Sequence, residues 1–176
     1  MKTNFTEMEK IPSFLKNTKE SLFDKLGLSI QNILLECESL EYDACQFQIK
    51  DKLISHRKAK ITPKKIGQFV TLWKRSKLGP IEPFHIKDGI DLFIIVTENK
   101  TKTGFFIFTK QILNEKGILS GKREGKRGFR VYPTWDKPNN KQGLTTQKWQ
   151  LPFFIELIDE KDSLDFLTNL LGSHFQ

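Results

Sequence analysis

Residues 89–110 read GIDLFIIVTENKTKTGFFIFTK. Two apolar runs, at 92–96 and 105–108, flank a polar stretch that ends at Gly104, and this pattern is typical of a β-hairpin. The runs carry almost no polar residue, so we expect the hairpin to be buried inside the protein. A buried hairpin needs other elements to cover it, and it therefore predicts a sheet at the centre of the fold.

The segments on the amino-terminal side of this hairpin predict three helices and a second hairpin. Apolar residues near helical spacing indicate helices over 5–25 and 29–40. Alternating apolar residues over 45–61 indicate two strands joined by a tight turn. Thr62 followed by Pro63 is typical of a helix start, so we expect the third helix to run from there to about residue 76.

The segments on the carboxyl-terminal side are shorter. We expect one or two helical turns over 111–117, a strand over 128–133 and a loop over 135–143. Two further helices are expected, over 145–157 and 162–172, although Pro152 must stand at the start or at a kink of the first.

This order of elements predicts an α+β fold, with a central mixed or antiparallel sheet and flanking helices. A restriction-endonuclease-like core is one arrangement that would satisfy it. A chain of 176 residues suits a single domain. We divide this domain into a helical amino-terminal part (1–44), a core (45–160) and a carboxyl-terminal helix (161–176), and we expect a monomer.

The composition points to a cytoplasmic protein. The longest apolar run is far shorter than the roughly 20 residues that span a bilayer, so we expect no membrane association. The first residues show no apolar signal segment. Cys37 and Cys45 fit two idle thiols in a reducing compartment better than a disulfide, although a disulfide stays open.

The net charge of +8 is concentrated in two blocks. Residues 50–77 hold ten Lys or Arg and one Asp, and residues 100–148 hold twelve Lys or Arg and three acidic residues. Basic blocks that meet on one face of a protein bind phosphates, so nucleic acid, DNA or RNA, is the expected partner. The alternative is that these cations form a solvated surface that keeps the protein soluble.

The stretch GKREGKRG at 121–128 carries four of these cations. It lacks the spacing of a P-loop or of a dinucleotide-binding loop, so we expect it to hold phosphates without a cofactor. Gly121, Gly125 and Gly128 would let its backbone approach the ligand. We expect Lys126, Arg127 and Arg130 to line one continuous phosphate-binding surface with three cations of the first block, Arg57, Lys60 and Lys65. Lys64 and Lys65 would lie in the first turn of the helix that starts at Pro63, whose amino-terminal amides also attract an anion.

Aromatic and amide side chains lie among the cations. Tyr132 and Trp135 could stack on bases, while Trp73 and Trp149 fit the core better, and Gln142 and Gln147 could reach base edges. The predicted nucleic-acid-binding residues are Arg57, Lys60, Lys64, Lys65, Arg75, Lys122, Arg123, Lys126, Arg127, Arg130, Tyr132, Trp135, Lys141, Gln142 and Gln147.

Enzyme signatures are weak, and we expect no metal site. His56, His85 and His174 are far apart, and the two cysteines do not form a C-x-x-C motif. The best single catalytic candidate is Asp91, near the start of a buried strand. A metal-dependent nuclease would use it to bind Mg²⁺, but the following strand offers no second carboxylate. A nuclease is therefore an alternative to a binding protein, and Mg²⁺ is expected only in that case.

Six stretches together resemble the MepB-like family over roughly residues 45–160: RKAKITPKKIGQFVTLWKRS, GPIEPF, IDLFIIV, GFFIFTKQIL, GKRGFRVYPTWD and TTQKWQ. This bacterial group is named for a gene neighbourhood beside a multidrug efflux pump and its repressor. The resemblance implies a small cytoplasmic protein and carries over no catalytic residue. It leaves open a third function, a drug- or small-molecule-binding accessory protein of an efflux system.

Overall fold

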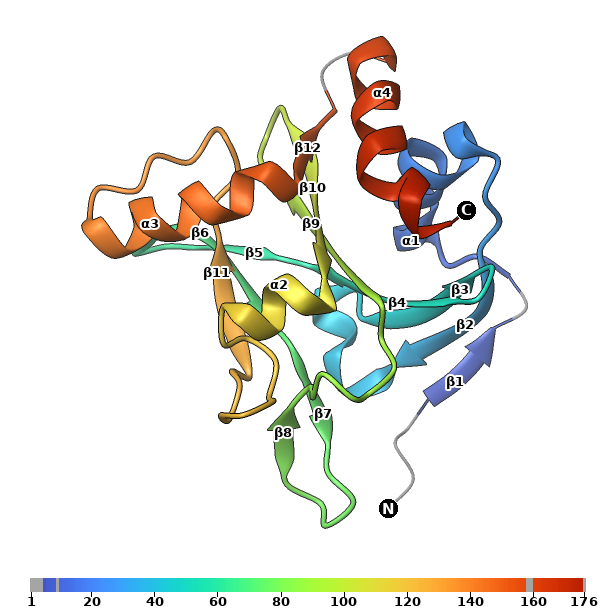
Figure 1. Cartoon of the computed structure of the whole chain (residues 1–176), viewed down its shortest axis with the longest axis horizontal. Helices are drawn as coiled ribbons and strands as arrows, with labels where there is room; N and C mark the ends of the chain where they lie inside the picture. Colours follow the sequence, from blue (N-terminus) through green and yellow to red (C-terminus); the bar gives the residue numbers. More distant parts are fainter. Residues whose placement is uncertain (1–4, 9, 158–159, 176) are drawn as a thin grey trace.

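A seven-stranded sheet forms the centre of the computed structural model, which describes residues 5–8, 10–157 and 160–175 (Figure 1). Its strands, in spatial order, are β1 (Phe5–Met8), β2 (Gln31–Glu36), β3 (Cys45–Ile49), β4 (Lys52–Lys58), β9 (Leu92–Glu98), β10 (Thr103–Thr109) and β12 (Phe154–Glu156). Strands β4 and β9 pair in parallel, and the other neighbours are antiparallel. The sheet is therefore mixed, and the α+β prediction is confirmed.

The central strands β9 and β10 bury both of their faces. Ile94 and Ile107 are paired across the hairpin and point into one apolar cluster. Their neighbours Phe93 and Phe108 are also paired, and they point into a second cluster on the other face. The predicted buried hairpin over 89–110 is therefore confirmed, and each face of the sheet needs its own cover.

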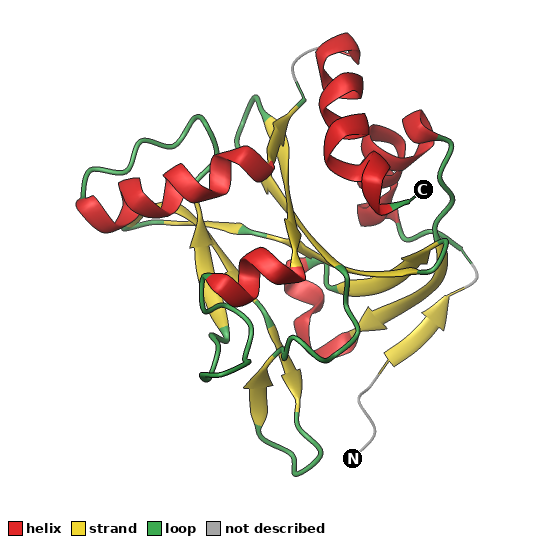
Figure 2. Cartoon of the chain, viewed as in Figure 1, coloured by secondary structure: helices red, strands yellow, loops and turns green. Residues whose placement is uncertain are grey.

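Helical segments from the two ends of the chain cover the first face (Figures 1 and 2). They are α1 (Ser13–Thr18), a π-helical turn (Lys19–Phe23), a 3-10 turn (Asp24–Leu26), α4 (Glu160–Leu171) and a last 3-10 turn (Gly172–His174). Leu15, Leu22 and Leu167 are fully buried against the sheet. None of the described helices is long and apolar enough to cross a bilayer.

A second, smaller sheet and two helices cover the other face. The small sheet has the order β11-β6-β5, with β5 (Lys60–Thr62), β6 (Lys65–Thr71) and β11 (Gly128–Val131). The two helices are α2 (Lys110–Glu115) and α3 (Lys141–Gln150). Val70, Phe129 and Leu113 of these elements meet Phe106 of the central sheet in one apolar cluster. Strands β7 (Trp73–Arg75) and β8 (Ile81–Pro83) form a hairpin that projects from this layer (Figure 1).

Three predicted helices are wrong in whole or in part. Residues 29–40 form β2 and then a 3-10 segment (Cys37–Tyr42), because pairing with β3 overrides the helical spacing. The helix predicted over 5–25 is replaced at its start by β1. The segment from Thr62 onward is a hairpin, not a helix: Pro63 and Lys64 form the turn between β5 and β6. Gly67 in β6 has φ +84°, which no α-helix accepts.

Most of the shorter predicted elements are confirmed with shifted ends. The turn between β3 and β4 is at Lys50 and Asp51. Helix α2 and strand β11 lie where they were predicted. The helix expected over 145–157 starts earlier, at Lys141, and ends before a 3-10 turn (Leu151–Phe153) and β12. Helix α4 begins at Glu160 rather than at 162.

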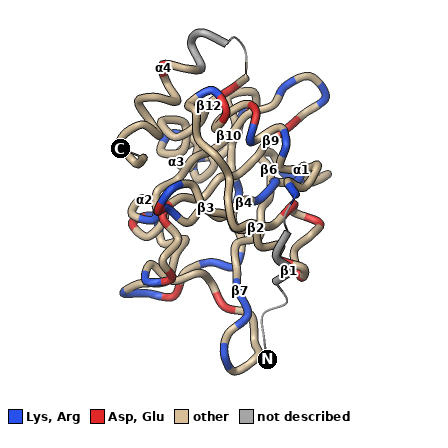
Figure 3. The backbone as a smooth tube through the Cα atoms, turned by 90° about the vertical axis from the view of Figure 1, so that its right-hand side faces the viewer, with Lys and Arg blue, Asp and Glu red and all other residues tan. Residues whose placement is uncertain are grey.

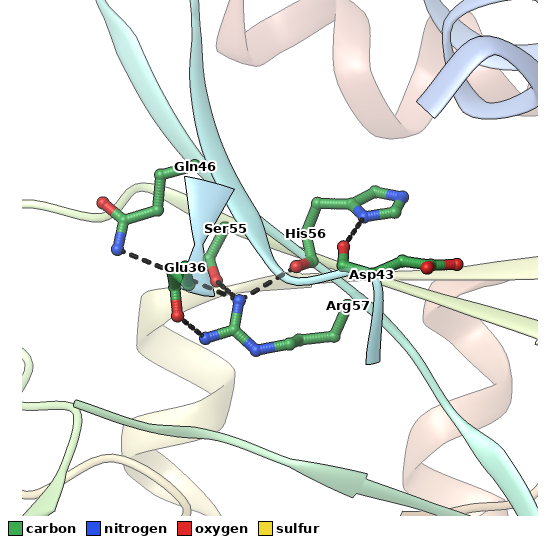
Figure 4. Close-up of polar contacts among 6 residues, drawn as sticks. All are labelled: Glu36, Asp43, Gln46, Ser55, His56 and Arg57. Carbon is green, nitrogen blue, oxygen red and sulfur yellow. Dashed lines mark hydrogen bonds and ion pairs between the residues drawn. The ribbon is translucent and has the colours of Figure 1, made fainter. Parts of the chain in front are cut away.

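Arg57, predicted as a phosphate ligand, is buried inside the fold, and this prediction is therefore wrong. Its guanidinium donates to the carboxylate of Glu36 with both terminal nitrogens, and Nη1 also donates to the backbone oxygen of His56 at 2.9 Å (Figure 4). Gln46 donates to the same carboxylate at 3.1 Å. The Arg57 side chain is only 1% exposed and that of Glu36 is 10% exposed. Arg57 therefore joins β4 to the end of β2.

We predict that Glu36→Gln strongly destabilises the fold. Removing one charge of a buried ion pair leaves the other charge uncompensated, which costs about 3–5 kcal/mol. Glu38→Gln is the matched control, because Glu38 pairs with Arg75 on the surface, where solvent weakens the interaction. Urea unfolding of both variants checks this expectation. Equal losses of stability in the two variants would show that the Glu36–Arg57 pair has no special structural role.

His56 is buried on the opposite face of β4. Its Nδ1 lies 3.0 Å from the backbone oxygen of Asp43, which can only accept, so Nδ1 carries the proton. Its Nε2 then accepts from the hydroxyl of Thr18 at 3.0 Å. Burial lowers the pKa of His56 to about 4 because the charged imidazolium would lose its hydration. The folded protein therefore holds this side chain neutral.

We predict that acid destabilises the fold through His56. The unfolded chain takes up a proton near pH 6.5 and the folded chain only near pH 4, so the stabilising contribution is complete above about pH 6.5. It is lost progressively as the pH falls toward 4, by an amount on the order of a few kcal/mol. Urea unfolding between pH 7.5 and 4.5, compared with the same series on His56→Gln, measures it. The variant should be less stable at neutral pH but should lose less stability on acidification; parallel pH profiles would contradict the assignment.

Candidate functional site

A groove of about 590 Å³ lies where the small sheet meets the amino end of α3 and the carboxyl end of α2. We call it the basic groove. The cations that line it are Lys64, Lys65, Lys116, Lys126 and Arg130. None of the described residues that line it is acidic. Cations from two distant parts of the sequence thus face one concave surface, which is the arrangement that attracts a polyanion.

Arg130 is the most firmly held of these cations. It lies on β11, where Phe129 and Val131 are buried and Arg130 points to the opposite side. Its Nη1 donates to the backbone oxygen of Gly67 at 3.1 Å and its Nη2 donates to the hydroxyl of Thr62 at 2.8 Å. Both acceptors are neutral, and no described carboxylate forms an ion pair with it. The guanidinium is therefore oriented without being neutralised.

Tyr132 continues the same face of the chain beyond β11 and lines the groove beside Arg130. Its ring packs against two glycines. A methyl group on Gly67 would lie 2.7 Å from the ring, and one on Gly143 would lie 3.6 Å from it. Because Gly67 also has φ +84°, a glycine is required there both by the backbone and by the aromatic ring.

Two glutamines of α3 fix the backbone of this segment. The fully buried Gln150 accepts from the backbone nitrogen of Tyr132 and donates to the backbone oxygen of Arg130, both at 2.9 Å. Its amide thus takes the place of a neighbouring strand at the free edge of β11. Gln147 donates to the backbone oxygens of Pro133 at 3.0 Å and Asp136 at 2.8 Å. The structure gives Gln147 this internal role, which differs from the predicted contact with base edges.

The first turn of α3 forms one wall of the groove. Asn140 caps the helix by accepting from the backbone nitrogen of Gly143 at 2.8 Å. Gln142 and Gly143 line the groove from this turn, and Thr146 lines it from the next turn. The positive end of the helix dipole adds to the potential of the cations. Gln142, unlike Gln147, therefore lies where the prediction needs it.

The loop 121–127 is bound to the rest of the fold by its backbone. Gly125 donates to the hydroxyl of Ser120 at 2.9 Å, and Lys126 donates to the oxygen of Ile118 at 2.9 Å. A methyl group on Gly125 would lie 2.4 Å from that same Ile118 oxygen, and one on Gly128 would lie 2.7 Å from the ring of Phe69. Glycine is therefore required at these two positions by close internal packing. The approach of a ligand to the backbone, which we predicted, is not needed to explain them.

Only Lys126 of the four cations in this loop reaches the basic groove. Arg127 pairs with Glu124 at 3.0 Å and donates to the backbone of β8. Lys122 and Arg123 line a separate hollow of about 470 Å³ beside the end of α2. The loop is thus divided between two surfaces. Of the six cations predicted to form one continuous surface, Lys65, Lys126 and Arg130 line the groove, whereas Arg57, Lys60 and Arg127 do not.

The remaining predicted residues lie outside the groove. Lys60 pairs with Glu41 at 2.6 Å, and Arg75 pairs with Glu38. Lys141 is exposed on the first turn of α3 but does not line the groove. Trp135 lines a neighbouring hollow, where its ring edge contacts Phe154 at a centroid distance of 5.6 Å.

Asp91 is engaged in structural contacts at the start of β9. Its carboxylate accepts from the backbone nitrogen of Leu53 at 3.0 Å and lies 3.4 Å from Nζ of Lys110. It does not line the basic groove. Among the described residues, no group of three or more His, Cys, Asp or Glu side chains is arranged to hold a metal ion.

Sequence reasoning missed several residues of the groove, of which Lys116 and Trp149 matter most for binding an anion or a base. Lys116 follows α2 and pairs with Glu115 at 3.1 Å, and its Nζ lies 6.0 Å from the ring centre of Trp149. Trp149 packs on Phe108 while also lining the groove. No local motif marks either residue, because only the tertiary fold brings them beside β11. The cap at Asn140 had a signal in the sequence, since Asn is one of the residue types preferred at the N-cap of a helix.

Comparisons with known proteins agree on one family. A solved crystal structure of MepB matches with a TM-score of 0.73 and 31% sequence identity, over 83% of this chain and 96% of that chain. No curated protein matches the sequence. A family model described as MepB-like matches residues 36–156, which include every cation of the basic groove. The chain belongs to the MepB-like family.

Proposed function

We propose that this protein binds nucleic acid through the basic groove, holding the backbone phosphates with its cations and stacking bases on its aromatic side chains. The observation that carries the proposal is the lack of charge neutralisation in the groove. Lys64, Lys65, Lys126 and Arg130 form no ion pair with any described carboxylate, and Lys116 pairs only with its sequence neighbour Glu115. An uncompensated cluster of like charges opposes folding, which favours a role in binding an anion.

The cations outside the groove support this argument by contrast. Lys60, Lys74 and Arg75 each lie within 4 Å of a carboxylate, at distances between 2.5 and 3.5 Å. Lys and Arg lie along many parts of the backbone, and several of these positions are close to Asp or Glu (Figure 3). Several surface cations of this chain are therefore paired, whereas four of the five cations that line the groove form no ion pair with a described carboxylate.

The walls of the groove suit a nucleotide chain better than an isolated anion. Tyr132 and Trp149 present aromatic carbon beside the cations, and base stacking contributes roughly 1–3 kcal/mol per base. Gln142 and Thr146 add polar groups that can bond to sugars or phosphates. A nucleic acid would use both kinds of wall, whereas a free phosphate would use only the cations.

The cellular setting is part of the same proposal. No disulfide joins Cys37 and Cys45, and burial raises the pKa of Cys45, which keeps its thiol protonated and unreactive. These features suit a reducing compartment, so we place the protein in the cytoplasm as a monomer that meets nucleic acid there. The nuclease alternative would need Asp91, whose carboxylate is already bound by Leu53 and Lys110.

We predict that Lys64→Ala/Lys126→Ala weakens nucleic-acid binding without unfolding the protein, since both side chains are exposed. If all five groove cations contact phosphates, log Kobs falls with log[salt] with a slope of about −3.5 on single strands. The double variant should have a slope shallower by about one to two units. Fluorescence anisotropy with labelled single- and double-stranded DNA, at about 50 and 200 mM salt, measures both quantities.

Lys16→Ala/Lys25→Ala is the control for net charge. It removes the same two charges from exposed positions on the helical cover of the other sheet face. It should bind almost as the wild type does. Binding that is lost equally in both variants would indicate general attraction to a basic protein, and wild-type binding by the groove variant would rule out the groove as the interface.

A further inference from the structure

A second hollow, of about 400 Å³, adjoins the basic groove. We call it the Trp135 hollow. Lys65 and Ile66 line both hollows, so the two lie beside each other. The Trp135 hollow differs in chemistry, because Ile61 joins Ile66 and Trp135 to give it apolar walls. Its polar lining adds an amide, a carboxylate and an ammonium group, from Asn99, Asp136 and Lys137. A surface suited to phosphates therefore lies next to one suited to a flat, partly polar ring.

A β-bulge creates this junction. Thr62 of β5 is paired with Lys65 of β6, but the preceding residue of β5, Ile61, is paired with Gln68. Ile66 and Gly67 are therefore extra residues on β6, and the left-handed φ of Gly67 permits the bulge. Ile61 and Ile66 remain 66% and 39% exposed beside it. At this bulge the regular pairing of β5 with β6 is interrupted, and two isoleucines next to Lys65 are exposed to solvent.

The polar residues of the hollow are held in place, and some of their hydrogen-bonding groups have no partner among the described residues. Gln147 fixes the backbone of Asp136, and Asn99 is fixed by its Oδ1, which accepts from the backbone nitrogens of Thr101 and Lys102 at 2.9 and 2.8 Å. No described residue accepts from the Asn99 Nδ2. The buried Nε1 of Trp135 also lacks a hydrogen-bond partner. Asp136 forms no ion pair with a described cation, and partial burial raises the pKa of its carboxyl group.

We propose that the Trp135 hollow binds one unpaired nucleobase of a strand whose phosphates lie in the basic groove. The apolar walls would cover the faces of the base, and the amide and carboxylate would meet its polar edge. The inference rests on the proposed function and adds to it a preference for single strands or extruded bases, because a base inside a duplex cannot leave the stack freely. A carboxylate accepts two adjacent N–H groups only from guanine, so guanine is the base expected to bind best.

An abasic strand tests this inference, because it keeps every phosphate and removes every base. The wild-type protein should bind an intact, guanine-containing single strand at least about fivefold more tightly than an abasic strand of equal length. Ile61→Ala should reduce this ratio toward one without changing the affinity for the abasic strand. Asp136→Asn should remove the preference for a single guanine placed in an otherwise abasic strand. Fluorescence anisotropy at constant salt gives all of these ratios.

Leu144→Ala is the matched control, since Leu144 is an aliphatic side chain of α3, 54% exposed, that lines neither hollow. It should bind both strands as the wild type does. Equal binding of intact and abasic strands by the wild type would overturn the inference while leaving the groove as a phosphate site. A ratio that Ile61→Ala does not change would place the base elsewhere, against Tyr132 or Trp149, and would also overturn it. Failure to bind either strand at low salt would instead contradict the proposed function itself.

Discussion

Burial of both faces of β9 and β10 is the constraint from which the rest of the architecture follows. Successive residues such as Phe93 and Ile94 point into different apolar clusters, so neither face can be left to solvent. One face is covered by helices from the two ends of the chain. The other is covered by the small sheet with α2 and α3, and the groove is formed where these covering elements meet.

The parallel pair β4–β9 explains where the small sheet comes from. Parallel neighbours need a long crossover connection, which in most proteins is a helix. Here residues 59–91 make the crossover as β5, β6 and the β7–β8 hairpin. This crossover carries Lys64 and Lys65, and β11 then pairs with β6 and adds Arg130. The connection that satisfies the sheet topology is therefore also the framework of the groove.

The edge of β11 shows how side chains complete this framework. Strand β11 has β6 on one side only, and its other edge would expose unpaired backbone groups in a part-buried region. Gln150 fills this need with one buried amide that both accepts and donates. The same contact fixes the backbone of Arg130 and Tyr132. The backbone from which the two side chains extend is thus fixed before any ligand arrives, which lowers the entropic cost of binding.

The sequence carried enough information for the buried hairpin, α2 and β11, because local apolar runs and glycines decide those elements. It was misleading at Thr62 and Pro63, whose preference for a helix start is also compatible with a tight turn between strands. Gly67 was the available signal there, since a left-handed glycine excludes a helix, but its φ cannot be read from sequence. Arg57 and Lys65 look equally basic in sequence, and only the fold buries the first against Glu36 and exposes the second.

The charge pattern of the sequence can be interpreted only once the fold shows which cations are paired with carboxylates. A count of Lys and Arg along the chain treats Lys60, Arg75 and Arg127 as equivalent to Lys126, yet the first three each lie against a carboxylate. Their charges are largely cancelled locally and reach little beyond the Debye length. Four of the five groove cations lack such partners among the described residues, and all five share a concave surface, where their fields add and are less screened. The attraction for an anion therefore depends on which cations the fold leaves unpaired, far more than on the net charge of +8.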